Sequence, residues 1–192
     1  MRTVRLLSLF LTSAMAAHAG IIVYGASLVG SQEVPPSGSP GTGTAFVTVD
    51  TVLQTLNVNV TFSGLGSGTT ASHIHCCEPL GVNAGVATTV PTFPSFPLGV
   101  TFGTYNMTFD LTTSLTYNPA FVTANGNTVA SAESALLAGL AAGQTYLNIH
   151  TTNFGNGEIR GQLEVVPEPA TWILTGATLA GLAAARRKKL LL

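Results

Sequence analysis

The stretch QTLNVNVTF, residues 54–62, sets the expected architecture of this 192-residue chain. Its large apolar side chains fall at every second position, and the residues between them are threonine and asparagine. Because successive side chains of a β-strand point to opposite faces, this alternation predicts a strand with one face in a core and the other on the surface. Residues 105–111 repeat the alternation, so the first expectation is a domain built from sheet.

Further strands, separated by turns rich in glycine and proline, are expected on both sides of this stretch. They cover residues 21–29, 44–50, 71–77, 146–151 and 158–165. In the last of them we expect the apolar residues to face the core and the polar residues to face outward. The inward set is Ile159, Leu163 and Val165, and the outward set is Glu158, Arg160, Gln162 and Glu164.

One helical segment interrupts this pattern. Residues 131–142 are rich in alanine and leucine, carry Glu133 early and end before Gly143, which predicts a short helix. The sequence therefore predicts an all-β fold, an antiparallel β-sandwich or Greek-key barrel with one short helix, over residues 20–165.

The first 19 residues are typical of a cleaved signal peptide. Arg2 and Arg5 precede an apolar run over residues 6–16, and Ala17 and Ala19 supply a small-x-small cleavage site. We expect signal peptidase to cut after Ala19 and the rest of the chain to be exported across the inner membrane.

The C-terminal residues 166–192 have three parts. Pro167-Glu168-Pro169 is followed by an apolar run over residues 170–185 and by the basic cluster Arg186, Arg187, Lys188 and Lys189. A helix over the apolar run reaches ~24 Å, short of a hydrocarbon core of ~30 Å. We expect a marginal transmembrane helix whose basic end stays cytoplasmic.

This tail resembles a PEP-CTERM sorting signal in the order, spacing and terminal position of its parts. The resemblance implies a Gram-negative bacterium and an exosortase that cuts near residues 167–169. The domain would then reach the periplasm, the cell surface or the extracellular matrix from a transient membrane-anchored precursor.

Residues 20–165 are acidic and nearly free of cations. The single base is Arg160, and the seven acids are Glu33, Asp50, Glu78, Asp110, Glu133, Glu158 and Glu164. Nucleic-acid binding needs several lysines or arginines on phosphates, so this partner class is excluded.

Several short motifs across these residues together resemble a CHRD domain. They are residues 32–36 (QEVPP), 41–45 (GTGTA), 64–65 (GL), 72–75 (SHIH), 146–151 (YLNIHT) and 157–163 (GEIRGQL). Two features depart from the family pattern: Cys76-Cys77 follows the His-x-His element, and residues 93–98 form a proline-rich loop. The resemblance implies an extracellular β-domain without established catalytic residues.

His73, His75 and His150 are the candidate metal ligands. Alternation places His73 and His75 on one face of a strand, away from the core, and a distant strand presents His150 in the same way. Three imidazoles suit zinc or copper. The alternative is that the rings only bond neighbouring groups and fasten the strands. Three histidines are too few for the two-metal site of copper–zinc superoxide dismutases, which share the His-x-His strand pattern.

Cys76 and Cys77 leave three possibilities open. In an oxidising compartment they can form a vicinal disulfide, which requires a local turn, or bridges to other chains. They can also ligate a metal beside His75 or act in redox chemistry.

We expect Arg160 to form a structural ion pair with Glu33 or Glu158 that ties the first loop to the last strand. No catalytic constellation stands out in the sequence. The leading hypothesis is a non-enzymatic surface or extracellular-matrix protein, sorted by an exosortase, that associates with extracellular polysaccharide and needs no cofactor. The alternative is a His/Cys metal-binding or redox β-domain.

Overall fold

The computed structural model describes residues 20–167, which form a single antiparallel sheet of nine strands with few helices. The expected all-β class is confirmed. The strands are β1 (Ile21–Val29), β2 (Thr42–Asp50), β3 (Thr55–Ser63), β4 (Thr69–Cys76), β5 (Gly85–Val86), β6 (Gly103–Asp110), β7 (Thr145–Thr151), β8 (Ile159–Gln162) and β9 (Glu164–Val165). The helices are α1 (Pro119–Ala124), α2 (Val129–Ala141) and two 3-10 turns, η1 (Gly30–Gln32) and η2 (Ser114–Thr116).

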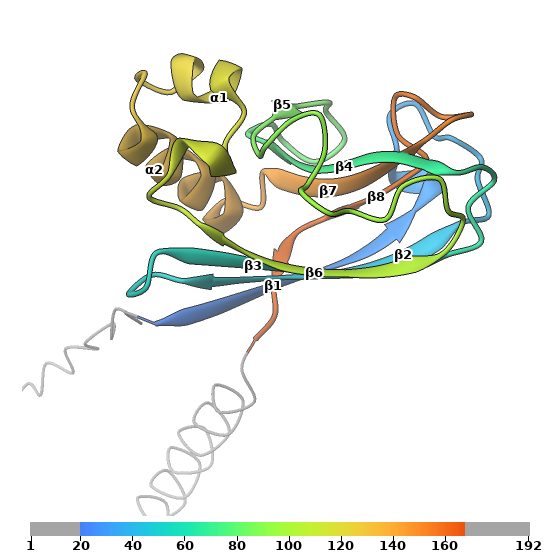
Figure 1. Ribbon diagram of the computed structural model, residues 1–192, viewed down its shortest axis with the longest axis horizontal. Coiled ribbons are helices and arrows are strands. Elements are labelled where there is room, and N and C mark those ends of the chain that lie inside the picture. The colour runs from blue at the N-terminus through green and yellow to red at the C-terminus, as the bar shows by residue number, and fades with distance from the viewer. Residues whose placement is uncertain (1–19, 168–192) are drawn as a thin grey trace, which may run out of the picture.

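The strand order is β5-β4-β7-β8-β1-β2-β3-β6, and β9 pairs with β1. In Figure 1 the half containing β4, β7 and β8 lies over the half containing β1, β2, β3 and β6. The end strands β5 and β6 do not pair with each other in this part of the chain. The architecture is thus one open, curled sheet rather than a closed barrel or two separate sheets.

A loop rather than a strand covers the open side. Residues 87–99 run along the outer edge of β4, where Ala87 N donates to Ile74 O, Phe93 N to Ser72 O and Gly99 N to Thr69 O. Phe93 and Phe96 from this loop are buried in the core. The loop therefore pairs the β4 edge and fills the space between the halves of the sheet.

The core lies between the two halves. Apolar residues of β2 and β3 face those of β4, β7 and β8, and α2 adds Leu136 and Leu140 at one end. Gly161 allows β8 to approach β1, because a Cβ at this position would collide with the backbone carbonyl of Ser27.

Two expectations about helices and the last strand were wrong. A second helix, α1, begins at Pro119 with Asn118 as its cap, and its six residues are too few to show a period. The last segment is two short strands, β8 and β9. Glu158 and Arg160 are buried there, while Val165 is 52% exposed.

The burial of Glu158 and Arg160 has a physical reason. The face of β4, β7 and β8 that points away from the core is covered by residues 30–40, 83–91 and 153–157, which bond to it. Polar side chains on this face therefore lie in a second, polar interior rather than in solvent. We call it the polar interior below.

The expected signal peptide (residues 1–19) and the sorting residues from Glu168 onward lie outside the described residues. Among residues 20–167, no helix is long and apolar enough to cross a membrane.

Candidate functional site

The structure brings the three predicted histidines together in the polar interior. His73 and His75 come from β4, and His150 comes from β7, whose residue Asn148 is paired with His73. The ring centroids of His73 and His150 are 5.2 Å apart, and those of His75 and His150 are 6.3 Å apart. One ring nitrogen from each residue lies within 4.8 Å of the other two.

One ring nitrogen of each imidazole is hydrogen-bonded to a backbone carbonyl oxygen. His73 Nε2 lies 2.6 Å from Pro91 O, His75 Nδ1 lies 2.8 Å from Ala84 O, and His150 Nδ1 lies 2.9 Å from Gly155 O. Because a carbonyl oxygen only accepts, the nitrogen that faces it must carry the hydrogen. The covering residues 83–91 and 153–157 therefore fix both the orientation and the tautomer of the rings.

The second nitrogen of each ring is buried and has no hydrogen-bond partner. These atoms are His73 Nδ1, His75 Nε2 and His150 Nε2. Burial lowers the pKa of all three histidines, and that of His75 falls to about 4. The rings are therefore neutral at pH 7, and their second nitrogens carry lone pairs.

Two neighbours on β7 complete this cluster. The ring of Tyr146 stacks on His75 at a centroid distance of 4.7 Å, and its hydroxyl accepts a hydrogen bond from Ala84 N. Asn148 Oδ1 is also buried without a partner. Tyr146 thus helps to position Ala84, whose carbonyl oxygen orients the His75 ring.

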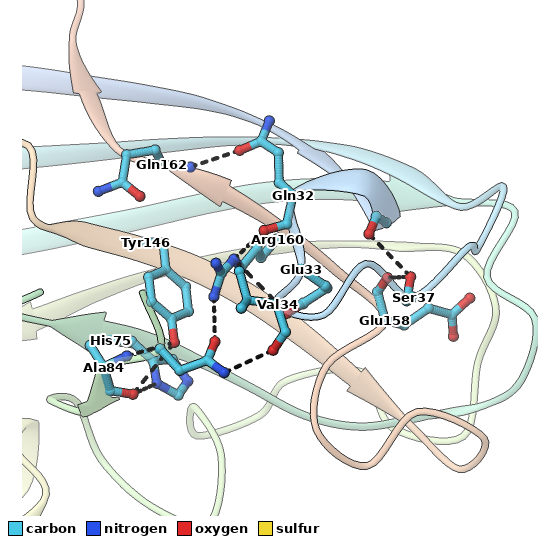
Figure 2. Close-up of polar contacts among 12 residues, drawn as sticks. Gln32, Glu33, Val34, Ser37, His75, Ala84, Tyr146, Glu158, Arg160 and Gln162 are labelled. Carbon is cyan, nitrogen blue, oxygen red and sulfur yellow. Dashed lines mark hydrogen bonds and ion pairs between the residues drawn. The ribbon is translucent and has the colours of Figure 1, made fainter. Parts of the chain in front are cut away.

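Arg160 lies beside this cluster and joins three segments (Figure 2). Its Nε donates to Gln32 O, and its Nη1 donates to Asn83 Oδ1 at 2.8 Å. Its guanidinium carbon lies 4.3 Å from the centroid of the Tyr146 ring. The side chain therefore connects the loop after β1, the loop before β5 and strand β7.

Glu33 is the acidic partner of Arg160, with Oε2 4.0 Å from Arg160 Nε and both side chains 5% exposed. Burial raises the pKa of Glu33 to about 7, although the positive charge of Arg160 lowers it. Desolvation outweighs this long ion pair, so the carboxyl is partly protonated at neutral pH. Its Oε1 atom is buried without a partner.

Glu158, our alternative partner for Arg160, was the wrong choice. Its carboxylate accepts hydrogen bonds from Ser39 Oγ and Gly66 N, both at 2.6 Å, and from Thr151 Oγ1. These donors fasten the loop before β2 and the loop before β4 to β7. Glu158 is thus a second, separate anchor of the covering loops.

Cys76 and Cys77 form a disulfide bond with each other across a cis peptide bond. The sulfurs pack against α2 at Gly139, where a Cβ would collide with Cys76 Sγ. They lie on the opposite side of β4 from His75 and leave no thiolate for the histidines. Of the possibilities left open by the sequence, the structure has the vicinal disulfide.

The fold and the polar interior define an all-β domain whose loops are anchored by one buried arginine and two buried glutamates. The family model for the CHRD domain matches residues 24–163, and the chain belongs to this family. The model for the PEP-CTERM protein-sorting motif matches residues 165–188. Both resemblances are confirmed, and no curated protein or solved structure matches the chain.

The sorting motif indicates where the chain is transported. A PEP-CTERM signal implies processing by an exosortase, so the chain is an exported protein sorted to the envelope or extracellular space. Reasoning from sequence found the three histidines, Arg160 and Glu33. It missed Asn83 and the three carbonyls that orient the rings, because neither a loop asparagine nor a backbone carbonyl has a sequence signature for the contact it makes.

Proposed function

We propose that this exported chain is a non-enzymatic component of the cell surface or extracellular matrix of a Gram-negative bacterium, where its β-domain associates with polysaccharide. Signal peptidase removes residues 1–19, and an exosortase cuts near residues 167–169. The short C-terminal helix holds the precursor in the membrane only until that cut. The sorting motif that directly follows the CHRD domain supports this route.

The observation that carries the polysaccharide proposal is the outer face of β2, β3 and β6. Neighbouring strands place like side chains in register across it: Thr44, Thr61 and Thr104 form one row, and Thr48, Asn57 and Thr108 form another. Asn57 Nδ2 donates to Asn106 Oδ1 at 2.8 Å and to Thr108 Oγ1 at 3.0 Å. These bonds hold the side chains in place before any ligand arrives. We call this surface the Thr/Asn face.

The Thr/Asn face suits a polymer rich in hydroxyl groups. Its hydroxyls and amides repeat at ~4.8 Å between strands and ~6.8 Å along them, so a chain of sugar hydroxyls meets many donors and acceptors at once. Phe46 lies among them, 49% exposed, and offers an aromatic ring to the apolar face of a sugar.

The charge of the Thr/Asn face favours a neutral polysaccharide. No lysine or arginine lies on it, and Arg160, the only cation in residues 20–167, is buried. Asp50 and Asp110 at one end of the face accept bonds from backbone N–H groups of the turns that follow them. Their carboxylates thus cap turns, which supports a binding role over a catalytic one.

The processing route predicts the mass of the exported protein. The form recovered outside the inner membrane should begin at Gly20 and lack residues 170–192, and intact-mass measurement on fractionated cells checks both cuts. A variant with Glu168→Ala should stay with the membrane fraction. Recovery of the uncut chain in the cytoplasm would contradict the proposal.

Binding to polysaccharide should depend on Phe46. Phe46→Ala should lower the affinity of the mature protein for the neutral exopolysaccharide of the same bacterium about tenfold, measured by cosedimentation. Burial of this ring contributes on the order of 1.4 kcal/mol to binding. The matched control is Leu115→Ala, which removes an 80% exposed apolar side chain outside the face. Binding should persist in high salt, since no charges are involved. Equal binding by Phe46→Ala and wild type, or loss of binding in salt, would refute this assignment.

A further inference from the structure

We propose that His73, His75 and His150 form a binding site for one zinc or copper ion, a property that goes beyond the surface role proposed above. The site lies in the polar interior, on the opposite half of the sheet from the Thr/Asn face. Its three ligand atoms would be the ring nitrogens that the covering loops leave without a partner.

The hydrogen bonds of the rings argue against a purely structural role. In a purely structural histidine, both ring nitrogens are expected to bond to neighbouring groups. Here only one nitrogen of each ring does so: His73 Nε2, His75 Nδ1 and His150 Nδ1 face carbonyl oxygens. The other nitrogen of each ring is buried as an unpaired acceptor, which is unfavourable because its hydrogen bond to water is lost and not replaced. Three unpaired acceptors gathered in one place are explained if they share a cation.

The carbonyl contacts match the outer shell of metal sites in proteins. A histidine that binds a metal through one ring nitrogen usually donates the N–H of its other ring nitrogen to a carbonyl or carboxylate. This bond fixes the ring and makes the ligand nitrogen more basic. Ala84 and Pro91 of residues 83–91 and Gly155 of residues 153–157 provide three such carbonyls. The ligands are therefore oriented by the fold before an ion binds.

The donor set selects the class of ion. Three imidazoles suit zinc and copper, whereas calcium and magnesium require oxygen ligands. Metal–nitrogen bonds of ~2.1 Å in a tetrahedral site place the nitrogens ~3.4 Å apart. One candidate nitrogen from each ring already lies within 4.8 Å of the other two, so each has to move inward by only part of the difference. Three protein ligands also leave a fourth position for water or another small ligand.

The test uses the mature exported protein, whose only histidines are these three because His18 belongs to the cleaved segment. After removal of metal, titration with zinc chloride and separately with copper(II) chloride should each show one equivalent bound. Copper should displace zinc, as expected for imidazole ligands. At a hundredfold excess over the dissociation constant, the melting temperature should rise by roughly 5–10 °C.

The variants separate this site from adventitious binding. His150→Gln changes the least buried of the three rings and should weaken binding at least a hundredfold, and His73→Gln should do the same. The matched control, Glu78→Gln with Glu164→Gln, removes two exposed carboxylates and should leave binding unchanged.

A measurement on the wild type avoids dependence on how the variants fold. Nitrogen NMR of labelled imidazoles should show zinc shifting the unprotonated nitrogen of all three histidines. Less than a tenth of an equivalent bound, or binding that survives both histidine variants, would overturn the proposal. Shifts confined to one or two rings would also overturn it.

Discussion

Replacing Arg160 with methionine is expected to lower the free energy of unfolding by about 3–5 kcal/mol, the usual cost of removing one partner from a buried charge network. Methionine fills a similar volume but donates no hydrogen bonds. Gln32 O and Asn83 Oδ1 would lose their donor, and Glu33 would lose the positive charge beside it. The contact with the Tyr146 ring would be lost too.

Urea unfolding at pH 7 measures this loss, and two companion variants identify its origin. Arg160→Lys keeps the charge but cannot reach Gln32 O and Asn83 Oδ1 together, so an intermediate loss is expected. Arg160→Met combined with Glu33→Gln should recover part of the stability, because no uncompensated acid remains buried. Glu164→Gln, which changes an exposed residue near the same strand, should leave the free energy of unfolding unchanged. A loss below 1 kcal/mol in Arg160→Met would mean that the network does not anchor the loops.

The period of the side chains predicted the strands but not their surroundings. Alternation over residues 54–62 identified β3, because the spacing of a strand is a local property. Alternation also placed Arg160 on the face opposite the core, which is correct. Whether that face meets solvent depends on loops 30–40 and 153–157, which are distant in sequence from most of the strands they cover. Alternation alone thus put Arg160 on an outward face, and only its expected ion pair pointed to burial; the residue is 4% exposed.

In the candidate site, too, local spacing predicted the side-chain faces, whereas contacts distant in sequence could not be predicted. The i, i+2 spacing of His73 and His75 was enough to place them on one face, and a matching strand pattern singled out His150. That β4 and β7 are neighbours could not be read from the chain, because strand order is set by contacts distant in sequence. The pairing of two adjacent cysteines was likewise left open, since extended neighbours point to opposite faces.

Changing Glu33 to glutamine is expected to stabilise the domain progressively as the pH rises from 5 to 8. The pKa of this carboxyl is about 7 in the folded domain against an ordinary value of 4.5, with burial as the main cause. Between these values the folded form keeps a proton that the unfolded chain has released. The stability linked to this proton is fully present below pH 4.5 and is lost as the pH passes 7. At about 1.4 kcal/mol per pKa unit, the loss is about 3 kcal/mol, and glutamine avoids it.

The difference between the two proteins isolates this group. Arg160, Tyr146 and the three histidines are common to both, so their own titrations largely cancel when the free energies of unfolding are subtracted. Urea unfolding at pH 5, 6, 7 and 8, with a chelator present to remove metal, gives the four differences. Glu164→Gln controls for the removal of an acid from an exposed position, and its difference from wild type should not change with pH.

The cation beside Glu33 provides an internal check of this argument. Arg160 lowers the pKa of Glu33, so in an Arg160→Met background the pKa should rise further. The pH window over which Glu33→Gln becomes stabilising should then move upward. A difference that stays flat from pH 5 to 8 in wild type would show that the buried carboxyl does not hold a proton at neutral pH. The ion pair with Arg160 would then outweigh desolvation, in spite of its 4.0 Å separation.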